Sequence, residues 1–232
     1  MNLKILDLQI SNIRSVVNAF RVVGHDPQVI KTAGEIVGAD LLVLPGVGAF
    51  RAAMKRIREA GLADPLRRHA LEEKKPLLGI CLGMQLLADR SEENGDTEGL
   101  GLIPGTVLRL NGDQEGVAVP NIGWHEVQKT RTDSLFPTAL DGAYFYHVHS
   151  YHLVPREDEA VAATIMFGHD RIATAVQKGN IAGVQFHPEK SQDAGLNLIA
   201  SIMAGFGRLP RMRLRDNASG LLALSTNGDE SS

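Results

Sequence analysis

Hydrophobic residues in the first part of the chain alternate between short continuous runs and helically spaced patterns. Residues 3–8, 40–44 and 76–80 form mostly apolar runs, which are typical of strands buried on both faces. Between these runs, apolar residues recur at the spacing of one helix face: Ile13, Val16, Val17 and Phe20, then Phe50, Met54 and Ile57. This alternation predicts an α/β fold, with an open, mostly parallel sheet flanked by helices.

The second half of the chain has a different pattern. Short strand-like runs follow one another, with turn residues between them, at residues 106–110, 144–152, 160–166, 172–176 and 181–185. They predict an additional, partly antiparallel region. Residues 194–206 are amphipathic and predict a closing helix. From about residue 208 the chain is rich in Arg, Ser, Asn and Gly, so we expect one domain over residues 1–207 and a disordered tail over 208–232.

The composition excludes several classes of protein. The chain has 232 residues, of which 44% are hydrophobic and 22% charged, so disorder, collagen and coiled coil do not describe it as a whole. A net charge of −3 gives no basic footprint for nucleic acid. No window reaches the run of about 18 apolar residues that a membrane-spanning helix needs. The single cysteine excludes an intrachain disulfide and favours a reducing compartment, so we expect a cytoplasmic protein without a nucleic-acid or membrane partner.

That cysteine, Cys81, lies between Gly79 and Gly83, after a predicted strand and before a predicted helix. This is the setting of a nucleophile elbow, with cysteine in the serine position. The turn is so sharp that side chains two residues to either side would collide, which favours glycine there. The N–H groups at the start of the helix favour a thiolate. A lone cysteine is more often a small buried hydrophobe, but the glycines and the strand–helix setting favour a nucleophile.

A base for this thiol is present in His187-Pro188-Glu189. Residues two apart in an extended segment face the same way, so the Glu189 carboxylate can hold the His187 imidazole in one tautomer. A third element, residues 45–48 (Pro-Gly-Val-Gly), ends a predicted parallel strand, where open α/β sheets bind ligands. Its glycines allow main-chain N–H groups to approach an oxyanion, although taken alone it is more simply a strand-to-helix turn.

In this order, the three elements resemble the class I glutamine amidotransferases over about residues 1–206. Residues 79–85 (Gly-Ile-Cys-Leu-Gly-Met-Gln) and 187–191 (His-Pro-Glu-Lys-Ser) resemble the two triad blocks of the family. Residues 120–124 (Pro-Asn-Ile-Gly-Trp) and 148–151 (Val-His-Ser-Tyr) are similar to blocks of one branch, the glutaminase subunits of imidazole glycerol phosphate synthase in histidine biosynthesis.

The resemblance implies a cofactor-free and metal-free reaction. Cys81 would attack the side-chain amide of L-glutamine, with His187 as base and Glu189 orienting it; ammonia leaves, and water releases glutamate. The oxyanion would be held by the N–H of Leu82 and that of Val47 or Gly48. Since Val47 lies between two glycines, its peptides can flip, and we expect this N–H to point away in the resting state. Further residues match positions that hold glutamine: Gly48, Gln85, Ser150 and Tyr151.

The resemblance also implies a partner, a (β/α)₈-barrel cyclase that takes up the ammonia. Its products would be imidazole glycerol phosphate and an aminoimidazole carboxamide ribonucleotide. Asn12, Trp124 and Lys190 match positions near its surface. Three departures fall near this interface: residues 7–12 read Asp-Leu-Gln-Ile-Ser-Asn where the family has Asp-Tyr-Gly-x-Gly-Asn, and His125 and His147 replace the Asn of Gly-Trp-Asn and the Phe of Tyr-Phe-Val-His.

These departures leave alternatives open. A paralogous amidotransferase that supplies ammonia for sugar amidination in surface-polysaccharide synthesis shares the main motifs. A catalytically silent scaffold is disfavoured by the intact Cys81, His187 and Glu189, and a thiol protease or deglycase-like enzyme by Gly-Met-Gln after the elbow. The spacing of His147, His149 and His152 suggests a metal, but in a strand the third would face away, so packed histidines are the favoured interpretation.

Overall fold

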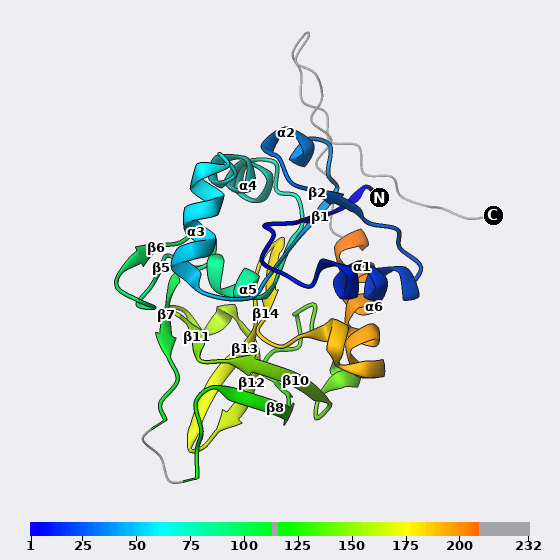
Figure 1. The fold of residues 1–232 in the computed structure, drawn as a ribbon. Coiled ribbons are helices and arrows are strands. Elements are labelled where there is room, and N and C mark those ends of the chain that lie inside the picture. Colours follow the sequence, from blue (N-terminus) through cyan, green and yellow to red (C-terminus); the bar gives the residue numbers. More distant parts are fainter. Residues whose placement is uncertain (113–115, 209–232) are drawn as a thin grey trace, which may run out of the picture.

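The computed structural model describes residues 1–112 and 116–208 (Figure 1). The predicted tail lies outside the described residues, apart from Arg208, which ends the last helix. Within these ranges no helix combines the length and the apolar character needed to cross a membrane.

An eight-stranded sheet forms the centre of the fold, in the order β2-β1-β3-β4-β14-β13-β12-β9. Strands β2, β1, β3, β4 and β14 run parallel, and the other three are joined antiparallel. The predicted combination of a parallel sheet with an antiparallel region is confirmed. The strands are β1 (Leu3–Leu6), β2 (Gln28–Ile30), β3 (Leu41–Gly46), β4 (Leu77–Cys81), β9 (Gln128–Lys129), β12 (Val161–Phe167), β13 (Asp170–Lys178) and β14 (Ile181–Val184).

Helices cover both faces of this sheet (Figure 1). The α-helices are α1 (Ile13–Val22), α2 (Ala33–Ile36), α3 (Phe50–Glu59), α4 (Ala63–Arg67), α5 (Leu82–Leu86) and α6 (Gln192–Arg208). Shorter turns of helix are the π-helix η1 (Arg68–Glu72) and the 3₁₀-helices η2 (Thr138–Leu140), η3 (Asp158–Ala160) and η4 (Pro188–Lys190).

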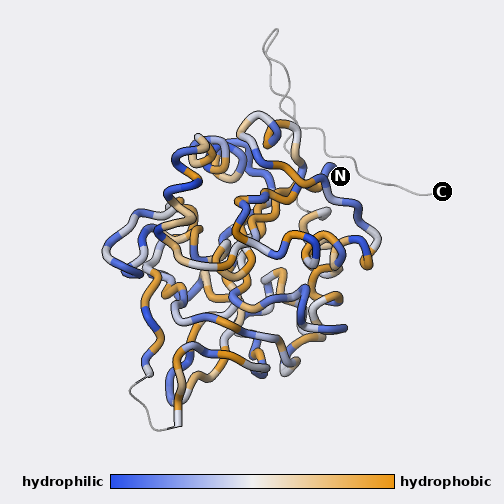
Figure 2. The backbone as a smooth tube through the Cα atoms, in the orientation of Figure 1, coloured by the Kyte–Doolittle hydropathy of each residue, from blue (hydrophilic) through white to orange (hydrophobic). Residues whose placement is uncertain are grey.

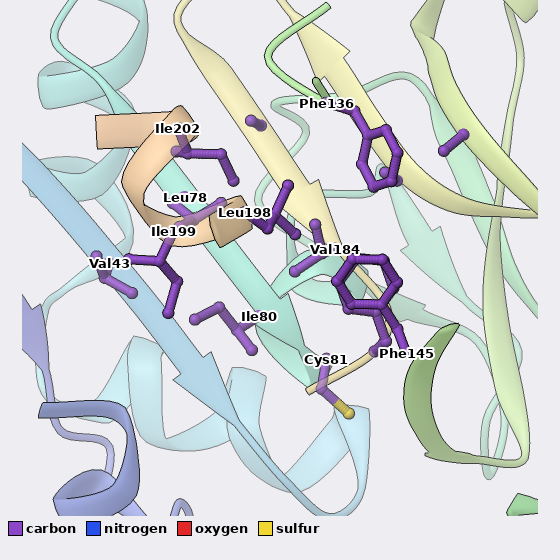
Figure 3. Close-up of a cluster of buried hydrophobic side chains, with 14 of the residues drawn as sticks. Val43, Leu78, Ile80, Cys81, Phe136, Phe145, Val184, Leu198, Ile199 and Ile202 are labelled. Atoms are coloured by element: carbon purple, nitrogen blue, oxygen red, sulfur yellow. The ribbon is translucent and has the colours of Figure 1, made fainter. Parts of the chain in front are cut away.

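The parallel strands are buried on both faces, so their side chains divide into two cores. In β3, Val43 packs into the core under α1 and α6, whereas Leu42 and Leu44 pack into the core under α3 and α5. This alternation follows from the two-residue repeat of a strand. Figure 3 shows the first core, with Leu198, Ile199 and Ile202 of α6 beside Val43, Leu78 and Ile80. Hydrophobic segments accordingly lie in the interior of the backbone trace (Figure 2).

Two smaller sheets lie beside the main one. One pairs β10 (Tyr144–His149) with β8 (Asn121–Glu126), and the other has the order β11 (Tyr151–Pro155), β7 (Gly105–Arg109), β5 (Arg90–Ser91) and β6 (Thr97–Glu98). The single strand expected over residues 144–152 is therefore wrong: the chain bends at Ser150 and changes sheet. The reason is non-local, because β10 pairs with β8 while β11 pairs with β7.

Candidate active site

Cys81 occupies a strained turn between β4 and α5. Its φ of 55° lies in the left-handed region, which is costly for a residue with a Cβ atom. A Cβ on Gly79 would come within 2.6 Å of the Gly83 carbonyl oxygen, and a Cβ on Gly83 within 1.7 Å of that of Leu44. Only glycine fits at these two positions, so the elbow inferred from the Gly-x-Cys-x-Gly pattern is present in the fold.

His187 and Glu189 follow β14, which pairs in parallel with β4 and so ends at the same edge of the sheet as Cys81. The Nδ1 of His187 lies 2.7 Å from Oε1 of Glu189, and their side chains are 3% and 4% exposed. Ser191 fixes this segment, because its Oγ donates to the His187 carbonyl and accepts from the Tyr146 N–H. The hydrogen bond to Glu189 leaves Nε2 of His187 as the nitrogen available to a substrate or thiol, and this buried atom has no hydrogen-bond partner among the described residues.

Electrostatics keep a proton on His187. Burial by itself lowers the pKa of an imidazole, but the neighbouring Cys81 sulfur and the Glu189 carboxylate outweigh it and raise the pKa of His187 to about 9. At neutral pH the ring is therefore an imidazolium. An imidazolium beside a sulfur favours the thiolate form, which is the nucleophilic one.

A pocket of about 290 Å³ opens beside Cys81. Its lining contains Cys81 and all of the residues expected to hold glutamine or the oxyanion: Val47, Gly48, Leu82, Gln85, Ser150 and Tyr151. Three further lining residues were not expected there: Glu93, Val148 and His149. His187 and Glu189 are not among the residues that line it. A larger cavity of about 690 Å³, near β11, β12 and β13, is lined by none of the predicted site residues.

Glu93 belongs to the site through a contact that no local pattern indicates. Its Oε2 accepts a hydrogen bond of 2.7 Å from the N–H of Phe50, the first residue of α3. This caps one of the free N–H groups at the start of that helix. The two residues are far apart in the sequence, so only the folded chain brings them together.

Gln185 was also missed, although it stands two residues before His187. Its side chain is fully buried, and its Nε2 donates toward the Sγ of Cys81 at 3.8 Å. Its Oε1 accepts a hydrogen bond of 3.0 Å from Nε2 of Gln85, which also donates to the Tyr151 carbonyl at 2.8 Å.

The Val47 N–H is turned away from the pocket. It donates to the Ile10 carbonyl at 2.9 Å, which is the resting arrangement expected from the two flanking glycines. Ile10 lies in the loop that lacks the family's glycines. Gln9 takes a φ of 59° there without being glycine, and its N–H donates to Oδ1 of Asp7 at 2.8 Å. This local hydrogen bond offsets part of the strain of the left-handed residue.

His147 and His149 are both held by hydrogen bonds inside the fold. His147 is fully buried between the Phe145 carbonyl and the Thr174 hydroxyl, at 2.9 and 2.7 Å. His149 contacts the Tyr151 carbonyl and the Asn121 amide. Burial lowers the pKa of both rings, that of His149 to about 3. Among the described residues, no group of three or more His, Cys, Asp or Glu has the arrangement of a metal site.

The residues expected near a partner share one side of the site. Trp124 is 43% exposed and meets the Tyr146 ring edge-on at 6.0 Å between centroids. Lys190 holds its Nζ 5.9 Å from the centroid of the same Tyr146 ring. Asn12 is the N-cap of α1, whose side chain makes no capping hydrogen bond, and α1 contacts η4, which carries Lys190.

Comparison with known proteins agrees with this geometry. The model of the family "Glutamine amidotransferase class-I" matches residues 4–201. The chain is 44% identical over 207 residues to the "Imidazole glycerol phosphate synthase subunit HisH" of Moorella thermoacetica, covering 89% of this chain and 94% of that one. The HisH subunit of Geobacter sulfurreducens is 42% identical over 209 residues, 88% of this chain and 97% of that one.

A longer plant protein and a set of solved structures are also similar. "Imidazole glycerol phosphate synthase hisHF, chloroplastic" of Arabidopsis thaliana is 41% identical over 197 residues, which are 84% of this chain but 33% of that one. The structure of PurLQS from Thermotoga maritima matches with a TM-score of 0.68 at 20% identity, over 88% of this chain and 99% of that one. A crystal structure of a glutamine amidotransferase matches with a TM-score of 0.66 at 22% identity, over 88% and 100%. These two structures share the fold.

Proposed function

This chain belongs to the class I glutamine amidotransferases, in the group of the imidazole glycerol phosphate synthase HisH subunits, and from that membership we propose that it hydrolyses L-glutamine to glutamate and ammonia with Cys81, His187 and Glu189 as its triad. The observation that carries the proposal is the buried His187–Glu189 pair beside the strained Cys81.

In the first half of the reaction, the Cys81 thiolate attacks the side-chain carbonyl carbon of glutamine, and a carbon–sulfur bond forms while the carbonyl electrons move to oxygen. The tetrahedral intermediate then collapses, and the carbon–nitrogen bond breaks. The Nε2–H of His187 protonates the departing nitrogen, which leaves as ammonia. Glu189 accepts the Nδ1–H throughout and stabilises the imidazolium.

In the second half, water attacks the glutamyl thioester while Nε2 of His187 takes up one of its protons. The intermediate collapses to glutamate, and the sulfur leaves as thiolate. Glutamine would be held by the pocket residues Gly48, Gln85, Ser150 and Tyr151. Both N–H groups of the Gln85 amide are used within the protein, so its Oε1 is the atom left to accept from the substrate.

The oxyanion formed in each half needs N–H donors. Leu82 is the first residue of α5, and its N–H has no partner within the helix. Val47 would supply a second donor, with Gly48 as the alternative, but the Val47 N–H is held by Ile10. We therefore place the described conformation in a resting state, in which one donor is withheld until a flip of the peptide turns it toward the pocket.

The relatives are named as subunits of a synthase, and we propose that the partner of this chain is a (β/α)₈-barrel cyclase. This cyclase would take up the ammonia and form imidazole glycerol phosphate and an aminoimidazole carboxamide ribonucleotide. The plant relative named hisHF, three times as long as the region matched, supports a covalent version of this pairing. The relatives at 40–44% identity favour histidine biosynthesis over sugar amidination. The lone thiol supports a cytoplasmic location.

The withheld donor leads to an expected dependence on the partner. The free subunit should hydrolyse glutamine very slowly, and the cyclase with its nucleotide ligand should raise the rate about a hundredfold, which requires about 2.7 kcal/mol of differential binding. The measurement is the steady-state glutaminase rate of the subunit alone, with the cyclase, and with cyclase plus nucleotide. Full activity of the free subunit would refute the gating. Activation by a sugar-modifying partner, and not by the cyclase, would instead assign the chain to sugar amidination in surface-polysaccharide synthesis.

Trp124 provides a test of the partner surface. Replacing Trp124 with alanine should weaken binding of the cyclase about thirtyfold, because a half-exposed tryptophan packed on Tyr146 has the character of an interface anchor, often contributing about 2 kcal/mol. Titration calorimetry measures this affinity. Val37→Ala, which removes a more exposed apolar side chain beyond α2, is the matched control. Equal affinities for the two variants would place the partner elsewhere.

A further inference from the structure

We propose that Gln185 is an additional catalytic residue, which donates an N–H group directly to the reacting sulfur of Cys81. The inference rests on the proposed role of Cys81 as nucleophile. Gln185 follows β14 by one residue, and the last pair of the β14–β4 register joins Val184 to Ile80. Gln185 therefore lies beside Cys81, which follows Ile80. Its main-chain N–H donates to the Thr174 carbonyl at 2.8 Å, and this fixes the backbone from which the side chain extends.

The hydrogen-bond network decides which end of the Gln185 amide faces the sulfur. The Tyr151 carbonyl can only accept, so the Gln85 group at 2.8 Å from it must be the Nε2 donor. The second hydrogen of this Nε2 points to Gln185, which must then present its Oε1 at 3.0 Å. The remaining end of Gln185, 3.8 Å from Sγ, is thus the N–H₂ group. If the amide were reversed, two donors would face each other at Gln85.

An amide N–H group that points at the Cys81 sulfur stabilises the negatively charged thiolate. A thiolate can only accept hydrogen bonds, and the buried Cys81 side chain, 5% exposed, has little contact with solvent that could supply them. A hydrogen bond from a neutral donor is stronger to an ion than to a neutral thiol. Gln185 therefore stabilises the thiolate before attack, and again when the sulfur leaves the thioester. Through Gln85, the same network links the sulfur to the pocket where the substrate would lie.

Alkylation of Cys81 tests this directly, because Cys81 is the single thiol of the chain. The rate with iodoacetamide, measured from about pH 5 to pH 10, reports the thiolate fraction. Gln185→Met keeps the size of the side chain and removes the donor. It should move the midpoint of the profile up by about one pH unit, so that the rate falls about tenfold at pH values below both midpoints, while the plateau at high pH stays unchanged. A purely structural defect would instead change the plateau.

Gln185→Glu separates the two functions of the side chain, which are to accept a hydrogen bond from Gln85 and to donate one to the Cys81 sulfur. It retains an acceptor for Gln85 but places a second acid against the sulfur, so the midpoint should rise by more than about one pH unit. Glutamine turnover should fall about tenfold or more in kcat, with KM close to that of the wild type. Gln177→Glu is the matched control: it makes the same charge change on β13, where Oε1 of Gln177 accepts from the Leu135 N–H. It should leave both profile and turnover unchanged.

Midpoints within about 0.3 pH unit of the wild type in both Gln185 variants would overturn the inference, since a shift that small is at most about a factor of two. This failure is distinct from failure of the proposed function. A wild-type chain that hydrolyses glutamine while its Gln185 variants alkylate normally would retain the triad and exclude Gln185. A chain without glutaminase activity in any complex would reject the proposed function, and the alkylation profile would still report the contact with the sulfur.

Discussion

Replacing Cys81 with alanine is expected to abolish glutamine hydrolysis, with a loss in kcat of about 10⁵ or more, while the fold remains intact. Removing the nucleophile of an enzyme with an activated triad typically costs about 10⁶ in kcat. Alanine fits the elbow, because it differs from cysteine by the sulfur alone and is under the same strain at a φ of 55°. The measurement is glutamate release by the complex with the cyclase, where the wild-type rate is highest.

A second readout shows that the variant is folded. The Cys81→Ala subunit should still bind the cyclase with unchanged affinity, since Cys81 is buried inside the pocket, whereas Trp124 is exposed. Synthesis of product should persist when ammonium salt replaces glutamine. Glutaminase activity within about a hundredfold of the wild type, in protein free of contaminating enzymes, would mean that another group performs the attack.

Replacing Glu189 with leucine is expected to lower kcat about 10⁴-fold, with little change in glutamine binding. The corresponding loss in a serine triad has this size, because the buried carboxylate holds the tautomer and stabilises the imidazolium. Here both effects depend on a single contact, the 2.7 Å hydrogen bond from Nδ1 of His187 to Oε1. The measurement is the steady-state rate over a range of glutamine concentrations, which separates kcat from KM.

Glu189→Gln should fall between the leucine variant and the wild type. The other carboxylate oxygen, Oε2, is buried and has no hydrogen-bond partner. No neighbour therefore forces the amide to present its N–H₂ group to His187, and glutamine can keep the hydrogen bond while losing the charge. Glu59→Gln, on the exposed surface of α3, removes a charge remote from the site and is the control. A decrease of less than tenfold in Glu189→Leu would exclude Glu189 from the triad.

Local spacing was sufficient to predict the elbow at Cys81, the contact between His187 and Glu189, and the parallel strands. The Gly-x-Cys-x-Gly pattern predicts the elbow, because the steric demand of the turn falls on residues within two positions of Cys81. His187 and Glu189 are two residues apart, so their contact could be predicted from the sequence. The expected extended geometry is wrong, because Glu189 lies in the 3₁₀-helix η4 (Pro188–Lys190), with His187 as its N-cap. The apolar runs likewise predict the parallel strands, because the side chains on both faces of such a strand lie in the core and are therefore apolar.

The tertiary structure decided the contacts between distant segments. The break at Ser150 depends on β10 and β11 pairing with different strands. The contact of Gln185 with the Cys81 sulfur, the hydrogen bond from the Phe50 N–H to Glu93, and the one from the Val47 N–H to Ile10 all join separate parts of the chain. Backbone geometry limits what residues a few positions apart can do, so local patterns carry that information. Pairings between distant segments depend on the total burial and hydrogen bonding of the whole fold. A short stretch of sequence does not determine these totals, so it cannot predict such pairings.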